Sequence, residues 1–256
     1  MTAAQPRVDQ WRVVRTGGLQ VRVRVQGEGE PLLLLNGLTR RLESWEPFVA
    51  ALGSGRQVVT FDSPGVGESP TPLLPLSISR LARVAVSVLD EVGLDVVDVL
   101  GFSHGGAVAQ QLAFQSPDRV RRLVLASTTC GVGSTPGDKD GLLSLGCGSA
   151  AGPSSPQPDP LGALWHSLAI ATWSSIPFLG AIRAPTLVVC GAHDRLVPAA
   201  NSRLLARRID GASLVLLSAG HDLQRSGPAT ALATAVQLFL THGLTSSSGK
   251  HLQDCV

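Results

Sequence analysis

Residues 96–111 read VVDVLGFSHGGAVAQQ. The first half is a run of β-branched and apolar side chains, which is typical of a buried strand. The second half, from Ala107 onward, suits a helix that packs against a sheet. The turn between them has the pattern Gly-x-Ser-x-Gly, with Ser103 at its centre. This arrangement predicts a nucleophile elbow, in which glycines at 101 and 105 leave room for a sharp turn that projects the Ser103 hydroxyl.

A second interpretation of this turn is purely structural. Serine is a common N-cap residue, so Ser103 could simply begin the following helix. The chain also contains 28 glycines, so Gly-x-Ser-x-Gly can arise by chance in a glycine-rich loop. The flanking sequence therefore has to distinguish a nucleophile from a helix cap.

Strand and helix patterns alternate on both sides of this stretch. Apolar or alternating segments predict an antiparallel hairpin at 11–26 and strands at 31–35, 57–61, 120–127, 185–190 and 213–217. Helical spacing predicts helices at 44–52, 77–92, 201–208 and 228–240. Such alternation predicts an α/β fold with a doubly wound, mainly parallel sheet and helices on both faces.

The composition favours one globular core. The chain has 256 residues, of which 44% are hydrophobic, and a formal net charge of +2. The charges are spread along the chain without a basic stripe, which argues against a nucleic-acid partner. The oligomeric state is left open.

Cysteine spacing and hydropathy bear on the compartment. The four cysteines are scattered, with neither metal-binding spacing nor a disulfide framework. The first residues lack an apolar signal-peptide core, and no apolar run is as long as a membrane span. We therefore expect a cytoplasmic protein with reduced thiols and without a transmembrane segment.

The alternating pattern is interrupted once. Residues 131–160 are dense in Gly, Pro and Ser, and 161–179 carry enough apolar side chains for one or two helices above the core. We expect a single core domain built from 1–130 and 181–242, with a lid insertion at 131–180. The polar stretch 243–256 is expected to be a flexible tail.

A serine nucleophile needs a histidine base, and the histidine needs an acid to orient it. Asp194 follows the strand predicted at 185–190, and His221 follows the one at 213–217. The chain order Ser, Asp, His is that of doubly wound hydrolases, and all three residues stand at carboxyl ends of strands, where ligands bind in open parallel sheets. The sequence thus predicts a catalytic triad of Ser103, Asp194 and His221.

Each partner also has an ordinary interpretation. Asp194 could cap the following helix, and His221 could be a surface loop histidine. His193 lies beside the acid and competes for the role of base. His166, in the lid, is expected to pack there or to contact substrate.

Acyl transfer also needs an oxyanion hole made of two backbone N–H groups. One is expected from His104, the residue after the nucleophile, whose imidazole need take no part. The other is expected from Leu38, in the turn Asn36-Gly37-Leu38 after the apolar strand. The alternative for Leu38 is an ordinary turn residue.

At this point the chain resembles the α/β-hydrolase family. The matching segments occur in the family's order and read LLLLNGL, FDSPGVGES, LGFSHGGAVAQQ, RRLVLAST, PTLVVCGAHDRLVP and SAGHDL. Within the family the chain is most similar to intracellular poly(3-hydroxyalkanoate) depolymerases. The similarity lies in Asn36-Gly37, in Asp62 to Gly67, and in the lid residues 164–168 and 172–177. Residues 131–160 and the Ala-Gly-His motif depart from the usual pattern.

The resemblance implies hydrolysis of ester bonds in a storage polyester or its oligomers, with no cofactor and no metal. Ser103, Asp194 and His221 match the family's nucleophile, acid and base. Four apolar lid residues would line the acyl side of the pocket, although each could instead pack the lid onto the core: Leu164, Trp165, Leu168 and Trp173. The alternatives are a C–C hydrolase, a lactonase, a cofactor-free perhydrolase, or a non-catalytic binding module on the same fold.

Overall fold

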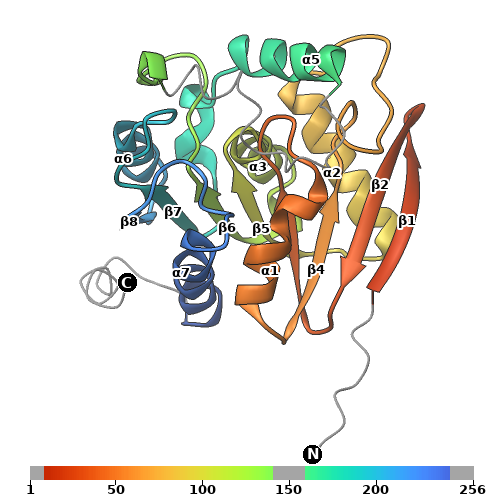
Figure 1. Ribbon diagram of the computed structural model, residues 1–256, viewed down its shortest axis with the longest axis horizontal. Coiled ribbons are helices and arrows are strands. Elements are labelled where there is room, and N and C mark those ends of the chain that lie inside the picture. The colour runs from red at the N-terminus through yellow and green to blue at the C-terminus, as the bar shows by residue number, and fades with distance from the viewer. Residues whose placement is uncertain (1–8, 141–158, 243–256) are drawn as a thin grey trace, which may run out of the picture.

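The computed structural model describes residues 9–140 and 159–242 (Figure 1). Eight strands form one sheet in the order β1-β2-β4-β3-β5-β6-β7-β8. The strands are β1 (Asp9–Thr16), β2 (Leu19–Gln26), β3 (Glu30–Leu35), β4 (Arg56–Phe61), β5 (Val97–Phe102), β6 (Val120–Ala126), β7 (Thr186–Gly191) and β8 (Ser213–Leu217). Every predicted strand is thus confirmed to within two residues at each end.

Strand direction follows from the pairing. β1 and β2 form the predicted antiparallel hairpin, and β2 pairs antiparallel with β4. From β4 to β8 every neighbouring pair is parallel. The carboxyl ends of β3, β5, β7 and β8 therefore meet at one edge of the sheet, the edge where ligands bind in open parallel sheets.

The helices cover both faces of the sheet, as Figure 1 shows. In the part of the chain that the structure describes, the helices are α1 (Glu46–Leu52), α2 (Ile78–Val92), α3 (His104–Gln115), α5 (Pro160–Ala171), α6 (Ala199–Arg208) and α7 (Pro228–His242), together with three 3-10 turns, η1 (Leu42–Trp45), η2 (Pro117–Arg119) and η3 (Ile176–Ala181). α1 and α7 pack on one face, and α2, α3 and α6 pack on the other. Within the described ranges, no helix combines the length and the apolarity needed to cross a bilayer.

α2 shows how local sequence sets these elements. The Ser77 hydroxyl accepts a hydrogen bond from the backbone N–H of Arg80 at 3.2 Å, and Gly93 ends the helix in a left-handed conformation (φ 76°). Leu81, Ala85 and Val88 lie on one side and are buried. The helix predicted at 77–92 is thus confirmed, and its caps and apolar face are set by its own sequence.

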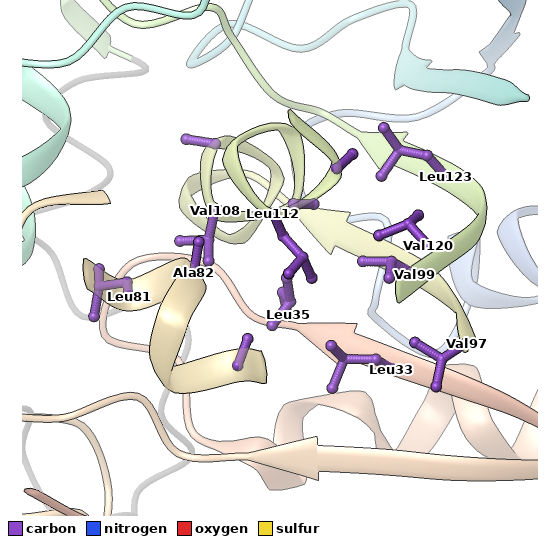
Figure 2. Close-up of a cluster of buried hydrophobic side chains, with 14 of the residues drawn as sticks. Leu33, Leu35, Leu81, Ala82, Val97, Val99, Val108, Leu112, Val120 and Leu123 are labelled. Atoms are coloured by element: carbon purple, nitrogen blue, oxygen red, sulfur yellow. The ribbon is translucent and has the colours of Figure 1, made fainter. Parts of the chain in front are cut away.

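Side chains of α2 and α3 interlock with the sheet in one of two buried clusters (Figure 2). In the close-up, Leu81 and Ala82 of α2 lie beside Val108 and Leu112 of α3, and strand residues such as Val99 complete the cluster. Burial of this apolar area is the main favourable term for the fold. It also holds the start of α3 rigidly at the end of β5.

In the segment predicted as a lid, α5 lies over the carboxyl edge of the sheet (Figure 1). α5 and η3 provide the helical structure predicted for 161–179, and Gly131 forms an isolated antiparallel bridge with Ser174. Of the glycine-, proline- and serine-rich stretch, 141–158 lies outside the described residues. The tail predicted at 243–256 lies outside them as well.

Candidate active site

Ser103 occupies the single residue between β5 and α3. Its φ is 52°, a left-handed conformation that is rare for a residue with a side chain. A Cβ atom at Gly105 would collide with the carbonyl oxygen of Leu35, and one at Gly101 would collide with the backbone of Gly105. The two glycines therefore permit a turn this tight, as the sequence predicted.

The elbow is fixed by neighbouring backbone groups. The Ser103 N–H donates to the carbonyl oxygen of Ala126 at 2.9 Å, and the Thr128 hydroxyl donates to the Ser103 carbonyl oxygen at 2.7 Å. Both partners belong to β6 and the residues just after it. The strained residue is thus held by a strand that pairs with β5.

The loops after β7 and β8 bring Asp194 and His221 to Ser103. His221 Nε2 lies 3.2 Å from Ser103 Oγ, and His221 Nδ1 lies 2.8 Å from Asp194 Oδ2. The other carboxylate oxygen of Asp194 accepts the backbone N–H groups of Leu196 and Val197 at 3.0 and 2.7 Å. The three side chains form one continuous hydrogen-bonded chain, with the Asp194 side chain fully buried.

His193 is not part of this arrangement. Its side chain is exposed, while its backbone N–H donates to the carbonyl oxygen of Ala219 at 3.0 Å. This bond ties the loop after β7 to the loop after β8. The structure thus brings the predicted base, His221, to Ser103 and leaves its competitor His193 outside the hydrogen-bonded chain.

The two expected oxyanion donors occupy the corresponding turns. His104 is the first residue of α3, where backbone N–H groups have no partner within the helix. Leu38 lies in the loop after β3, directly before Thr39, whose φ is 57°. Their role as donors stays a prediction.

The imidazoles of His104 and His166 form a buried contact between α3 and α5. Their rings meet edge to face with centroids 4.8 Å apart, and His166 Nε2 lies 2.9 Å from the carbonyl oxygen of Pro64. Burial lowers the pKa of His104 well below its ordinary value, and it lowers that of His166 too. Both rings are therefore neutral at pH 7, and His166 is a packing residue of the lid.

The four apolar lid residues divide into two pairs. Leu164 and Leu168 are exposed on α5, at 50% and 42%. The indole N–H of Trp165 donates to the carbonyl oxygen of Pro72 at 3.1 Å, and that of Trp173 donates to Gln111 Oε1 at 2.7 Å. The two tryptophans thus attach the lid to the core. Substrate contact by any of the four stays a prediction.

Sequence reasoning missed the polar supports of the site. Asn36, noted only as a family feature, is buried and donates to the carbonyl oxygen of Arg41 and to the Ser44 hydroxyl at 2.7 and 2.8 Å. Its Oδ1 accepts the Gly37 N–H at 2.9 Å and the side-chain amide of Gln224 at 3.0 Å. An Asn directly after an apolar strand was the available signal, but its partner Gln224 is 188 positions away in the sequence.

The first part of the glycine-rich stretch is attached to the acid loop. Asn201 of α6 exchanges two hydrogen bonds with the backbone of Thr135, at 2.7 and 2.8 Å. Arg195, next to the acid, forms ion pairs with Asp138 and Asp140 at 2.6 and 2.7 Å. This part of the predicted lid is therefore anchored beside Asp194, which its composition did not reveal.

Comparison with known proteins identifies the family to which this fold belongs. A model of the alpha/beta hydrolase fold family matches residues 30–143 and 151–228. The chain belongs to the α/β-hydrolase family. The solved structure of a hydrolase from Pseudomonas aeruginosa PA01 superposes with a TM-score of 0.78 and 27% sequence identity. The match covers 90% of this hydrolase and 98% of the solved chain. The structure of an enol-lactonase from Burkholderia xenovorans LB400 superposes with a TM-score of 0.79 and 26% sequence identity. This match covers 91% of the chain and 100% of the lactonase.

Two curated proteins are similar to this α/β hydrolase in sequence. A poly(3-hydroxyalkanoate) depolymerase of Ectopseudomonas oleovorans is 35% identical over 238 residues, which are 82% of this chain and 84% of the relative. The 3-oxoadipate enol-lactonase 2 of Acinetobacter baylyi is 26% identical over 222 residues, which are 77% of this chain and 83% of the lactonase. The family and these relatives support hydrolase activity. The resemblance to depolymerases predicted from the sequence is confirmed.

Proposed function

We propose that this α/β hydrolase cleaves carboxylic esters through an acyl-enzyme on Ser103. The observation that carries the proposal is the hydrogen-bonded chain from Ser103 Oγ through His221 to Asp194 Oδ2, at 3.2 and 2.8 Å. A hydroxyl becomes an effective nucleophile only next to a base, and the base needs an acid to orient it. The convergence of a strained serine and two loop residues at one edge of the sheet supports the proposal.

The proposed reaction has two halves. Ser103 Oγ attacks the carbonyl carbon while His221 Nε2 accepts its proton, and Asp194 stabilises the imidazolium through Nδ1–H. The backbone N–H groups of Leu38 and His104 stabilise the oxyanion. His221 then protonates the leaving alkoxide, which departs as an alcohol. Water, deprotonated by His221, hydrolyses the acyl-enzyme to release the acid and restore Ser103.

The proposed substrate is a 3-hydroxyalkanoate polyester or its oligomers. The depolymerase relative, 35% identical over most of both chains, supports this substrate class. The apolar lid side chains, two of them exposed on α5, are proposed as contacts for the acyl side. We place the reaction in the cytoplasm, with no cofactor and no metal.

A second candidate substrate is a lactone. A lactone is a cyclic ester, so the same attack by Ser103 opens its ring. Two enol-lactonases among the relatives, one similar in sequence and one in structure, favour this candidate over C–C cleavage.

The test is hydrolysis of p-nitrophenyl esters of increasing acyl length, and of a polyester suspension, by the wild type and Ser103→Ala. We expect wild-type activity on medium chains with clearing of the suspension, and a fall of about 10⁶-fold in turnover in the variant, whose melting temperature should stay close to wild type. Wild-type activity on short esters or lactones without clearing would overturn the polymer substrate. Undiminished turnover in Ser103→Ala would overturn the mechanism.

A further inference from the structure

Two loops on either side of Ser103 are joined by polar side chains. The β3 loop (residues 36–40) contains the expected oxyanion donor Leu38, and the β8 loop (residues 218–225) contains His221. Arg40 Nη2 donates to Asp222 Oδ1, and Gln224 Nε2 donates to Asn36 Oδ1 at 3.0 Å. Two separate side-chain pairs thus link the donor loop to the loop of the base.

The Arg40–Asp222 ion pair is largely removed from solvent. The exposed fractions of the two side chains are 13% and 25%. Ion pairs on a protein surface contribute little, whereas a buried pair is strongly disrupted when one partner is lost. Asp222 Oδ2 also accepts from Arg225 at 3.0 Å, so the carboxylate is held from two sides.

Phe102, directly before the nucleophile, connects both ends of this pair to the site. The Arg40 guanidinium lies over the Phe102 ring at 5.3 Å from its centroid, within the range of a cation–π contact. The same ring packs against the His221 imidazole with centroids 5.1 Å apart. A displacement of Arg40 would therefore change the position of His221 through Phe102 as well as through Asp222.

The β3 loop also contains a strained residue. Thr39 has a φ of 57°, which β-branched residues rarely adopt. The Arg40 N–H donates to the carbonyl oxygen of Gly37 at 3.2 Å and closes a turn around Leu38 and Thr39. Strained conformations persist only when surrounding contacts enforce them, and the Arg40 side chain supplies such a contact.

We propose that Arg40 and Asp222 form a positioning pair that fixes the oxyanion-donor loop relative to the base His221. The inference rests on the proposed triad and deepens it. Neither residue contacts the reacting atoms. The pair acts by keeping Leu38 N–H and His221 Nε2 correctly spaced around Ser103, so its loss should affect the transition state more than substrate binding.

The test is a double-mutant cycle with Arg40→Met, Asp222→Asn and the double variant. Kinetic constants on a p-nitrophenyl ester, the rate of Ser103 labelling by a fluorophosphonate, and the melting temperature are measured for each. Arg40→Lys tests rescue because it keeps the charge. Arg56→Met is the matched control, because Arg56 forms a similarly buried pair with Asp98, with exposed fractions of 11% and 0%, at the opposite edge of the sheet.

We expect each single variant to lower kcat about 10- to 100-fold with little change in KM, since displacements of about 1 Å can cost that much. The double variant should be no slower than the slower single variant, because both remove the same contact. Arg40→Lys should recover part of the loss. Arg56→Met should lower the melting temperature and leave kcat within about twofold.

Equal kcat in Arg40→Met and wild type would overturn the inference. Losses that multiply in the double variant, or that also occur in Arg56→Met, would overturn it too. If the wild-type protein is labelled at Ser103 but hydrolyses no ester, the proposed substrate is overturned. The double-mutant cycle would then compare the rates of Ser103 labelling in place of kcat. Failure of the phosphonate to label wild type would overturn both proposals.

Discussion

Backbone strain is concentrated beside the nucleophile. Among the described residues, the non-glycine residues with positive φ are Thr39, Ser103 and Ser127, at 57°, 52° and 44°. They follow β3, β5 and β6 at the carboxyl edge of the sheet. Such conformations cost on the order of 1–3 kcal/mol each and are typical of functional sites. Their convergence supports the assignment of the site independently of side-chain chemistry.

Asp194→Asn tests the acid at the residue scale. The amide keeps the shape of the side chain but would no longer hold His221 in the tautomer whose Nε2 accepts the Ser103 proton. We expect kcat to fall about 10⁴-fold with little change in KM. Steady-state kinetics on a p-nitrophenyl ester measure this. Asp90→Asn, at an exposed ion pair with Arg119, is the control; unchanged kinetics in Asp194→Asn would assign the acid elsewhere.

The buried histidine pair predicts a pH dependence of stability. Burial lowers the pKa of His104 and His166 below the ordinary value of 6.5, so the unfolded chain binds more protons than the folded one. Stability is therefore present above about pH 6.5 and is lost as the pH falls through that value, by up to about 1.4 kcal/mol per pH unit for each histidine. Urea denaturation between about pH 5.5 and 7.5 measures the slope.

His166→Gln should flatten this slope because it removes one of the two protonation sites. His242→Gln, at an exposed histidine of α7, is the control and should keep the wild-type slope. Equal slopes in all three proteins would contradict the assignment. Burial also raises the pKa of Asp62 and Asp98, and their protonation would oppose the histidine effect at lower pH.

At the scale of elements, the junction of β5 and α3 depends on close backbone approach. Gly105→Ala would push a methyl group against the carbonyl oxygen of Leu35, which belongs to a buried strand and cannot easily move. We expect a loss of about 1–3 kcal/mol or more in the free energy of unfolding, with loss of activity, because overpacking is destabilising. Urea denaturation and ester hydrolysis measure both effects.

Gly227→Ala is the control for this junction, because a Cβ atom there meets nothing within 4 Å. It should unfold and react like wild type. If Gly105→Ala also behaves like wild type, the elbow does not require glycine at 105.

The elements were predictable because their signals are local. α2 has a serine cap, a glycine stop and an apolar face within its own sequence, and the short apolar strands are bounded by turn residues. The order and placement of the three triad residues were predictable for the same reason, since Asp194 and His221 each come four positions after a predicted strand. The ring contact between His104 and His166 was not, because it joins α3 to the lid.

At the scale of the whole molecule, α5 of the predicted lid is attached to the core at several points. Gly162 of α5 lies directly against Gly65, and His166 and Trp165 bond to the carbonyl oxygens of Pro64 and Pro72. These contacts bury one side of α5 on the loop after β4. The opposite side carries Leu161, Leu164 and Leu168, all exposed.

The double variant Leu164→Ser, Leu168→Ser tests substrate contact by the lid. If these side chains contact the acyl chain, kcat/KM should fall about tenfold on long p-nitrophenyl esters and stay near wild type on short ones, since each buried CH₂ contributes about 0.8 kcal/mol. Leu216→Ser is the control, because Leu216 is 39% exposed on β8. An unchanged preference for acyl length would exclude both leucines from the acyl site.

The sequence by itself determined the parallel sheet, its hairpin, the elbow at Ser103 and the order of the three triad residues. These features depend on short-range periodicity, turn chemistry and chain order. Only the tertiary structure decided that Arg40 pairs with Asp222 and Asn36 with Gln224. These two pairs join residues 182 and 188 positions apart. Loops far apart in the chain meet only because parallel strands bring their carboxyl ends to the same edge, and no local pattern specifies which side chains then pair.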